Sequence, residues 1–134
     1  MATTYTDFVA PKGYKDHLGM FAVSCFGCDA LVKKFEADND DYSKIMAQAL
    51  ANRFVEAFSE YLHREICTNS WRYAPDEKLD ETDLLKIKYD GIRPAPGYPS
   101  QPDHTEKKKM WEAINAEEVA GIKLSGSPSM MPAA

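Results

Sequence analysis

The longest regular pattern in the chain is a stripe of apolar residues that recurs every three or four positions between Tyr42 and Cys67. This spacing places the apolar side chains on one face of an α-helix. No glycine or proline interrupts the segment, and residues 38–41 read Asp-Asn-Asp-Asp, which offers several N-caps in front of it. The pattern therefore predicts one dominant helix over about residues 42–67. The stripe consists of Ile45, Met46, Ala49, Leu50, Phe54, Ala57, Phe58, Tyr61, Leu62 and Ile66.

Shorter helices are predicted on both sides of this helix. Residues 28–37 carry apolar side chains at helical spacing. A helix over residues 106–116 has two candidate N-caps, Asp103 and Thr105. Both segments are therefore expected to pack one apolar face against the rest of the chain.

One more short helix is expected over residues 81–89. Asp80 can cap it, and Asp83 three positions later makes an approximate capping box. Gly91 follows the segment as a plausible helix stop, because glycine readily adopts the left-handed conformation that ends many helices.

Two segments are expected to be strands. Residues 19–26 form a short run rich in apolar and aromatic residues, typical of a buried strand, and residues 121–124 read as a second, shorter one. Residues 1–17 are expected to form an irregular arm, and residues 125–134 a tail without clear period. The fold class that follows is α+β, with one long helix, shorter helices and a few antiparallel strands in a single domain.

Composition narrows the functional classes. A length of 134 residues favours one domain. The net charge of -5 and the pI of about 5.2 disfavour nucleic acid as a partner, because that binding depends on a surplus of Lys and Arg. No apolar run approaches the roughly 20 residues that cross a bilayer, and the N-terminal residues do not resemble a secretory signal. Three cysteines fit a reducing compartment, so we expect a cytoplasmic location, with an organelle interior as the other option.

Prolines cluster in residues 91–102, where four of the eight in the chain lie between positions 94 and 102. Proline fixes φ and biases the preceding residue towards extended geometry. The composition therefore predicts a stiff, extended loop with few internal hydrogen bonds. The segment reads Gly-Ile-Arg-Pro-Ala-Pro-Gly-Tyr-Pro-Ser-Gln-Pro.

This loop and the long helix resemble the activation domain of cobalamin-dependent methionine synthase. The resemblance rests on residues 91–99, on the Pro-Asp-His-Thr-Glu-Lys run at 102–107, and on the helix that follows Asp40-Asp41-Tyr42. Residues 71–75, Trp-Arg-Tyr-Ala-Pro, and residues 121–124 resemble the family in the same order. The likeness covers nearly the whole chain from about Asp7, and the Arg-Pro-x-Pro-Gly-Tyr-Pro loop is its most specific part.

The resemblance implies a set of ligand-binding residues and no catalytic or metal-binding ones. In the family this loop holds S-adenosylmethionine, so Arg93 is expected to pair with the ligand carboxylate. Ala95, Gly97 and the nearby backbone would line the site, and Tyr98 would face the cobalamin side. Glu56 on the long helix matches a family position near the site. A proline-braced loop suits such a role, because little entropy is lost when a stiff segment binds a ligand.

The family's reaction is the rescue of oxidised cobalamin, which accepts an electron from a flavin reductase or flavodoxin and a methyl group from S-adenosylmethionine. The cobalamin sits on another domain of the family. By resemblance, the chain would be part of a methyltransferase and not a complete enzyme. The family domain is more than twice as long, so the chain is expected to be truncated at both ends, without an acidic residue that holds the ligand amino group.

The residues leave other interpretations open. A chain derived from this domain could be a non-catalytic accessory subunit of a larger complex. Arg93 could cap a helix or pair with a surface acid, and Tyr98 could be a packed turn aromatic. Glu56 could be a solvated helix residue paired with Arg53 or His63.

Cysteine and charge patterns have similar alternatives. Cys25 and Cys28 form a Cys-x-x-Cys pair that Cys67 and His63 could complete as four metal ligands. Inert packing of buried cysteine explains the pair more simply. The three lysines at 107–109 are typical of a solvated helix face.

Overall fold

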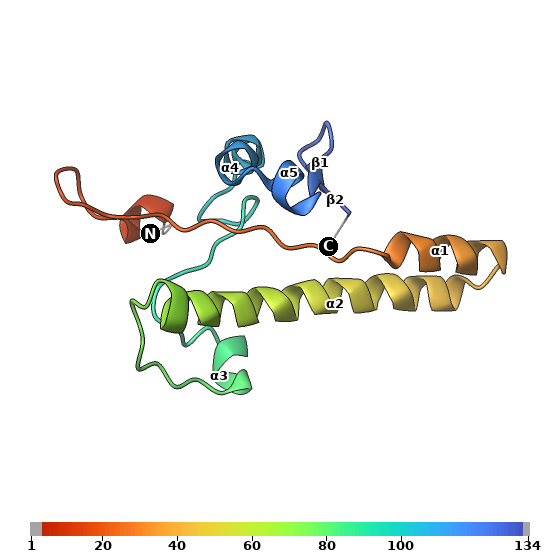
Figure 1. Cartoon of the computed structure of the whole chain (residues 1–134), viewed down its shortest axis with the longest axis horizontal. Coiled ribbons are helices and arrows are strands. Elements are labelled where there is room, and N and C mark those ends of the chain that lie inside the picture. The colour runs from red at the N-terminus through yellow and green to blue at the C-terminus, as the bar shows by residue number, and fades with distance from the viewer. Residues whose placement is uncertain (1–3, 133–134) are drawn as a thin grey trace. The chain divides into compact units, whose positions relative to one another are not determined.

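The computed structural model describes residues 4–132, which divide into two compact units. The first unit consists of Met1–Phe21 and His63–Asn115, and the second of Ala22–Leu62 and Ala116–Ala134. Figure 1 shows the elements in chain order. They are a 3₁₀ turn at Tyr5–Phe8, α1 (Cys28–Ala37), α2 (Asp41–Glu65), a π turn at Ile66–Ser70, α3 (Glu81–Leu85), α4 (Glu106–Ile114), α5 (Ala116–Ala120), β1 (Lys123–Leu124) and β2 (Met130–Met131).

The long helix is confirmed, and the residues around its ends explain its limits. Asp40 Oδ1 accepts a hydrogen bond from the Ser43 backbone N–H at 2.9 Å, which satisfies one of the donors at the start of α2. At the other end, α2 passes into the π turn, and Arg72 then adopts a left-handed backbone with φ 60°. This left-handed residue stops the helical run, because consecutive helical residues need negative φ.

The helix α1 is also confirmed, and with the start of α2 it forms a helical hairpin in the second unit (Figure 1). Gly27 precedes α1 with φ 90°, a conformation that glycine adopts at little cost. Asn39 makes the turn between the helices with φ 55°. A Lys44 Nζ–Glu36 Oε1 ion pair of 2.6 Å joins the two helices.

The face that α2 buries is made of small and polar side chains. Every fourth residue from Ala51 to Cys67 is buried, and Ser59 Oγ in this row donates to the Val55 carbonyl at 2.9 Å. The larger side chains of the apolar stripe are exposed, among them Phe54 and Phe58. The helix therefore presents its bulky apolar side to solvent. The buried row is Ala51, Val55, Ser59, His63 and Cys67.

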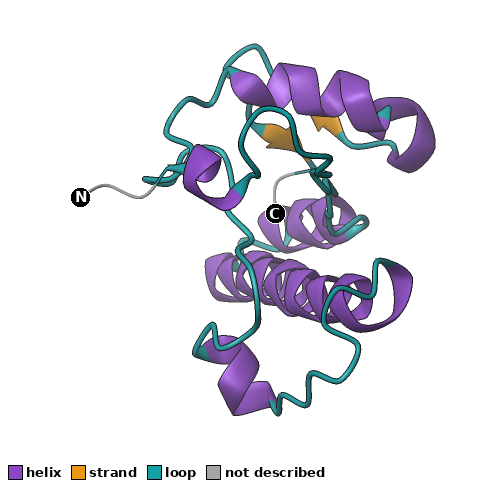
Figure 2. Ribbon diagram, turned by 90° about the vertical axis from the view of Figure 1, so that its left-hand side faces the viewer, coloured by secondary structure: helices purple, strands orange, loops and turns teal. Residues whose placement is uncertain are grey.

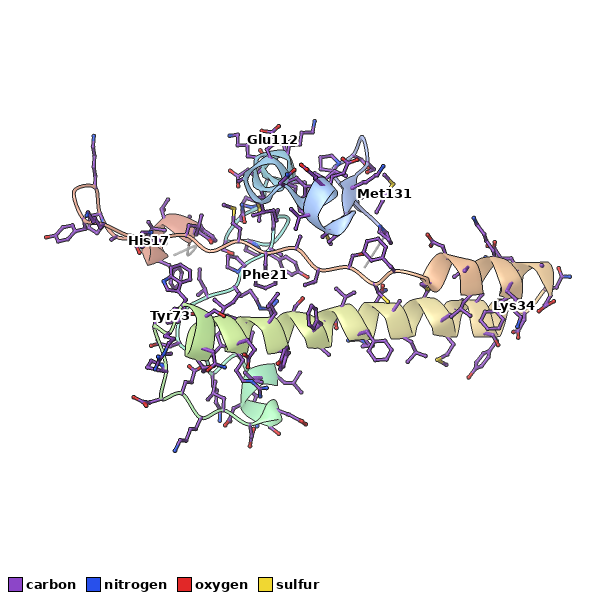
Figure 3. The ribbon with its side chains drawn as sticks, viewed as in Figure 1. His17, Phe21, Lys34, Tyr73, Glu112 and Met131 are labelled. Atoms are coloured by element: carbon purple, nitrogen blue, oxygen red, sulfur yellow. The ribbon has the colours of Figure 1, made fainter. Side chains whose placement is uncertain are left out.

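The predicted strand over residues 19–26 is wrong. The segment is irregular, and within residues 4–132 its backbone groups make no hydrogen bond to another segment. Figure 3 labels Phe21 in this stretch, which carries neither helix nor strand. Alternating or apolar sequence alone does not make a strand, because its backbone groups need a neighbouring strand to pair with.

The strand predicted at residues 121–124 is present as β1, and the tail holds its partner. β1 and β2 pair antiparallel, with Lys123 opposite Met131 and Leu124 opposite Met130. The Ser125 N–H donates to the Ser129 carbonyl at 2.8 Å and closes the connection. The mostly helical chain with this small two-stranded sheet (Figure 2) confirms the predicted fold class. The tail is thus partly ordered as β2, while residues 133–134 lie outside the described part.

Two helix predictions need correction. Asp80 does cap α3 by accepting from the Asp83 N–H at 2.8 Å, but α3 ends at Leu85 rather than near Tyr89. Ile87 turns left-handed with φ 55° and ends the helical path before Gly91 is reached.

The predicted helix over residues 106–116 is split in two. Asn115 has φ 50° and separates α4 from α5, consistent with the tolerance of asparagine for that region. Thr105 is the N-cap of α4 but makes no side-chain cap bond, whereas Asp103 Oδ1 accepts from the Thr105 N–H at 2.8 Å. No helix among residues 4–132 is long and apolar enough to cross a bilayer.

Candidate binding loop

The proline-rich segment folds into two consecutive turns, so the prediction of an extended loop is wrong. In the first turn the Tyr98 N–H donates to the Ala95 carbonyl at 3.2 Å. Pro96 and Gly97 occupy the central positions, and Gly97 has φ 104°. Proline followed by glycine with positive φ is the pattern of a type II turn. The sequence signal for this turn was present in the Pro-Gly pair.

The second turn locks the first one in place. The Gln101 N–H donates to the Tyr98 carbonyl at 2.8 Å, and the Gly97 N–H donates to the Gln101 carbonyl at 2.7 Å. Tyr98 and Gln101 also form an isolated antiparallel bridge. The backbone of Gly97 and Tyr98 is therefore fixed by hydrogen bonds inside the loop.

Gly97 lies against an imidazole ring. A Cβ atom built on Gly97 would collide with the ring of His104, which shows how closely this ring covers the backbone. His104 stands just before α4, and its ring packs against the turn at Gly97.

The end of the loop is tied to α4. Gln101 Nε2 donates to Glu106 Oε2 at 2.7 Å. Asp103 Oδ1 accepts from both the N–H and the hydroxyl of Thr105, at 2.8 and 2.7 Å. The hydrogen bond from the Thr105 hydroxyl is the main cause that lowers the pKa of Asp103. On the other side of the loop, the Tyr5 N–H donates to the Ser100 carbonyl at 3.3 Å.

Arg93 stands at the entrance of the loop and is half-buried. Its positive charge acts on His63 at the end of the buried row of α2. Burial is the main cause that lowers the pKa of His63, the Arg93 charge lowers it further, and Glu77 works in the opposite direction. The guanidinium therefore has a neutral imidazole as a neighbour rather than a second cation.

The predicted site residues fall into two groups. Arg93, Ala95, Gly97 and Tyr98 belong to one loop of the first unit, and the Tyr98 side chain is 65% exposed. Glu56 lies on α2 in the second unit, where its carboxylate pairs with Arg53 at 2.7 Å and both side chains are solvent-exposed. This ion pair agrees with the simpler interpretation of Glu56 as a solvated helix residue.

A polar cluster beside the loop was not predicted. Cys67 Sγ lies 2.6 Å from Tyr73 Oη, and His63 Nε2 lies 3.4 Å from the same oxygen. Burial is the main cause that raises the pKa of both Cys67 and Tyr73. Figure 3 labels Tyr73 beside the C-terminal end of α2. The spacing of His63 and Cys67 on one helix face was the only sequence signal for this cluster, because Tyr73 reaches it from a different segment.

The cysteine pair and Cys67 belong to different units. Cys25 and Cys28 are half-buried in the second unit and line a hollow of about 250 Å³, whereas Cys67 belongs to the first unit. Among residues 4–132, no group of three or more His, Cys, Asp or Glu side chains is arranged to hold a metal ion.

Comparison with known proteins identifies relatives of this chain. The model of the family described as "Vitamin B12 dependent methionine synthase, activation domain" matches residues 1–134. A solved structure, the "MetH Reactivation Domain bound to AdoHcy", has 51% sequence identity and a TM-score of 0.76 over 78% of this chain. The match covers 32% of that solved chain, so the present chain spans about a third of its length.

Proposed function

The chain belongs to the family of vitamin B12 dependent methionine synthase activation domains, and from this membership we propose that it binds S-adenosylmethionine through the loop that begins at Arg93. The solved relative was crystallised with AdoHcy, the product that remains after S-adenosylmethionine gives up its methyl group. The observation that carries the proposal is the pair of turns that follows Arg93, in which hydrogen bonds within the loop fix the backbone of Gly97 and Tyr98.

Arg93 is the residue proposed to bind the amino-acid carboxylate. A guanidinium presents a planar fork of N–H donors that matches a carboxylate in two parallel hydrogen bonds. Its partial burial strengthens such a pair, because fewer water molecules screen it than at the open surface.

The remaining loop residues are proposed to contact the rest of the ligand. The small side chain of Ala95 is proposed to let a ligand approach the backbone closely. Gly97 is proposed to shape this part of the site by letting the turn pack against the ring of His104. Tyr98 projects an exposed ring whose face attracts cations, which suits a sulfonium or the adjoining cobalamin. Glu56 is proposed from the family resemblance to exchange Arg53 for a cationic group of the ligand.

The family context sets the wider scheme. When bound on a separate domain or chain, cobalamin supplies the cobalt that receives the methyl group. In this proposal the present chain contributes the loop that orients the methyl donor, and a flavodoxin or flavin reductase supplies the electron. The reaction would take place in a reducing compartment, the cytoplasm or an organelle interior.

Isothermal titration with S-adenosylmethionine tests the proposal. The parent chain is expected to bind, and Arg93→Ala is expected to weaken binding at least about tenfold, which corresponds to ~1.4 kcal/mol. Arg72→Ala is the matched control, because it removes an exposed arginine of the same unit that lies outside the loop.

The outcomes separate cleanly. Equal affinity of the parent and Arg93→Ala would show that the guanidinium does not hold the carboxylate. A parent chain that gives no heat over a wide range of ligand concentrations would overturn ligand binding by this chain.

A further inference from the structure

The backbone just before Arg93 is held by two side chains from an earlier segment. Glu77 Oε1 accepts a hydrogen bond from the Asp90 N–H at 2.7 Å. Tyr73 Oη donates a long hydrogen bond of 3.5 Å to the Asp90 carbonyl. Both backbone groups of Asp90 are therefore occupied by residues that lie more than ten positions away in sequence.

We propose that Tyr73 and Glu77 are positioning residues, which fix the backbone at Asp90 and Gly91 so that Arg93 is presented to the carboxylate of its ligand. This inference rests on the proposed function. Neither side chain is proposed to contact the ligand, and both act through the backbone that leads to Arg93.

Gly91 lies next to the Tyr73 hydroxyl. It has φ 86°, and a Cβ atom built on it would lie 3.4 Å from Tyr73 Oη. The Tyr73 hydroxyl is thus within van der Waals contact of this left-handed turn residue. Because Arg93 follows only two residues later, a rotation of the chain at Gly91 displaces the guanidinium directly.

The Tyr73 side chain is itself held in place by contacts with other residues. Its hydroxyl contacts the fully enclosed thiol of Cys67 and approaches His63 at the end of the buried row of α2. Its ring meets Trp71 edge to face at 5.8 Å between ring centres. Tyr73 therefore connects the end of α2 and the π turn to the backbone that leads into the binding loop.

Glu77 also belongs to the electrostatic surroundings of Arg93. Its charge raises the pKa of His63, whereas the charge of Arg93 lowers it, so both groups act on the same imidazole. The Glu77 carboxylate thus holds the Asp90 N–H and places a negative charge in the neighbourhood of the guanidinium. Glu77→Gln removes this charge and weakens the hydrogen bond but keeps the size of the side chain.

Hydrogen exchange tests whether the two side chains hold the backbone. In Glu77→Gln the Asp90 amide is expected to exchange at least about tenfold faster than in the parent, because its acceptor is weakened. Glu81→Gln is the matched control, an exposed glutamate of the same unit. Tyr73→Phe is a second variant, which keeps the ring against Trp71 and removes only the hydroxyl.

Ligand titration then separates positioning from a general loss of structure. We expect both variants to bind S-adenosylmethionine three- to tenfold more weakly than the parent, with little change for its decarboxylated analogue. The two compounds should differ because the two residues act through Arg93. The decarboxylated analogue has no carboxylate for Arg93 to bind, so the position of Arg93 does not affect its affinity. Thermal unfolding of each variant verifies that it is folded.

Four results would overturn the inference. An unchanged exchange rate of the Asp90 amide would show that Glu77 does not hold the backbone there. Equal losses of affinity for both compounds would indicate a structural defect instead of positioning. If the parent binds while both variants match the Glu81→Gln control, only the positioning role is wrong. If the parent binds neither compound, the proposed function is wrong and the positioning role falls with it.

Discussion

His63 is a buried histidine whose environment keeps it uncharged. It is 6% exposed, and its Nδ1 atom is buried with no hydrogen-bond partner among the described residues. Its ring packs edge to face on Tyr89 at 4.3 Å between ring centres, and Cys67, Tyr73, Glu77 and Arg93 are further titratable groups near it. Burial and the Arg93 charge lower its pKa, so the folded state binds a proton less readily than the unfolded state.

This difference makes stability depend on pH. Below the ordinary histidine pKa of 6.5, His63 is protonated in the unfolded chain, whereas in the folded chain its lowered pKa keeps it neutral to a lower pH. Stability is therefore expected to fall as pH drops through 6.5 towards the lower pKa of the folded state, by up to ~1.4 kcal/mol per pH unit. Urea unfolding at pH 7.5 and 5.5 measures the loss.

The control for this prediction is His63→Leu, in which the loss between the two pH values should become smaller. The carboxyl groups of Asp40 and Asp103 have lowered pKa values because of hydrogen bonds from Ser43 and Thr105, so they lose their contribution only below about pH 4. An undiminished loss in the variant would assign the effect to other groups.

Gly97 carries a second prediction at the scale of one residue. Gly97→Ala places a Cβ atom against the ring of His104 at a backbone φ of 104°. We expect the substitution to destabilise the loop by about 1–3 kcal/mol and to weaken S-adenosylmethionine binding, because both turns must rearrange. Thermal unfolding and titration measure the two effects.

Gly126→Ala is the comparison for that experiment. Gly126 lies in the β1–β2 connection, and a Cβ atom built there meets nothing within 4 Å. If the two variants have equal thermal stability and equal affinity for the ligand, Gly97 would not be packed against His104 as the structure shows.

At the scale of the element, α3 depends on its N-cap. With five residues it has few internal hydrogen bonds, and Asp80 satisfies the exposed donor at Asp83. Asp80→Ala is expected to cost about 0.5–2 kcal/mol of local stability. Amide exchange of residues 81–85 is the appropriate measurement, with the exposed Asp76→Ala as the control. Unchanged exchange in Asp80→Ala would show that tertiary contacts hold α3 without the cap.

The elements that could be predicted from the sequence are those whose cause is local. The stripe and its acidic cap identify α2, and Asp80 locates the start of α3. The strand prediction for residues 19–26 was wrong because a strand needs a neighbouring strand to pair with, and their own sequence does not provide one. The left-handed Ile87 that shortens α3 has no sequence signal, since β-branched residues rarely adopt this conformation.

The candidate site divides in the same way. Proline and glycine at 96 and 97 specify a turn by their own geometry, although the expectation of an extended loop overlooked it. The support from Tyr73 and Glu77 joins residues that are 13 to 17 positions apart, and only the folded chain brings them together. The roles of Arg93, Ala95, Gly97, Tyr98 and Glu56 towards a ligand stay predictions.

At the scale of the molecule, the second unit exposes a broad apolar face formed by α2, α1 and the residue Phe26 before α1. The face borders a hollow of about 560 Å³, and its members are between 43% and 74% exposed. An apolar patch of this kind promotes association in water. It consists of Phe26, Leu31, Tyr42, Ile45, Met46, Leu50, Phe54, Phe58 and Tyr61.

We expect the double variant Phe54→Glu, Phe58→Glu to bind less of an apolar fluorescent dye and to stay monomeric at higher concentration than the parent. Both side chains are more than half exposed, so the helix should tolerate the change. Asn52→Glu adds charge to an exposed position of the same helix without removing an apolar side chain and serves as the control. Light scattering across a dilution series measures the degree of self-association. Equal scattering by the parent and the double variant would show that association uses another surface.

The path of the chain through its two compact units has a practical consequence. Each unit is assembled from two separate stretches, and one boundary between them, after Leu62, falls inside α2. No contiguous piece of the chain therefore consists of one whole unit and nothing of the other. A protease that cuts within α2 would divide both units at once.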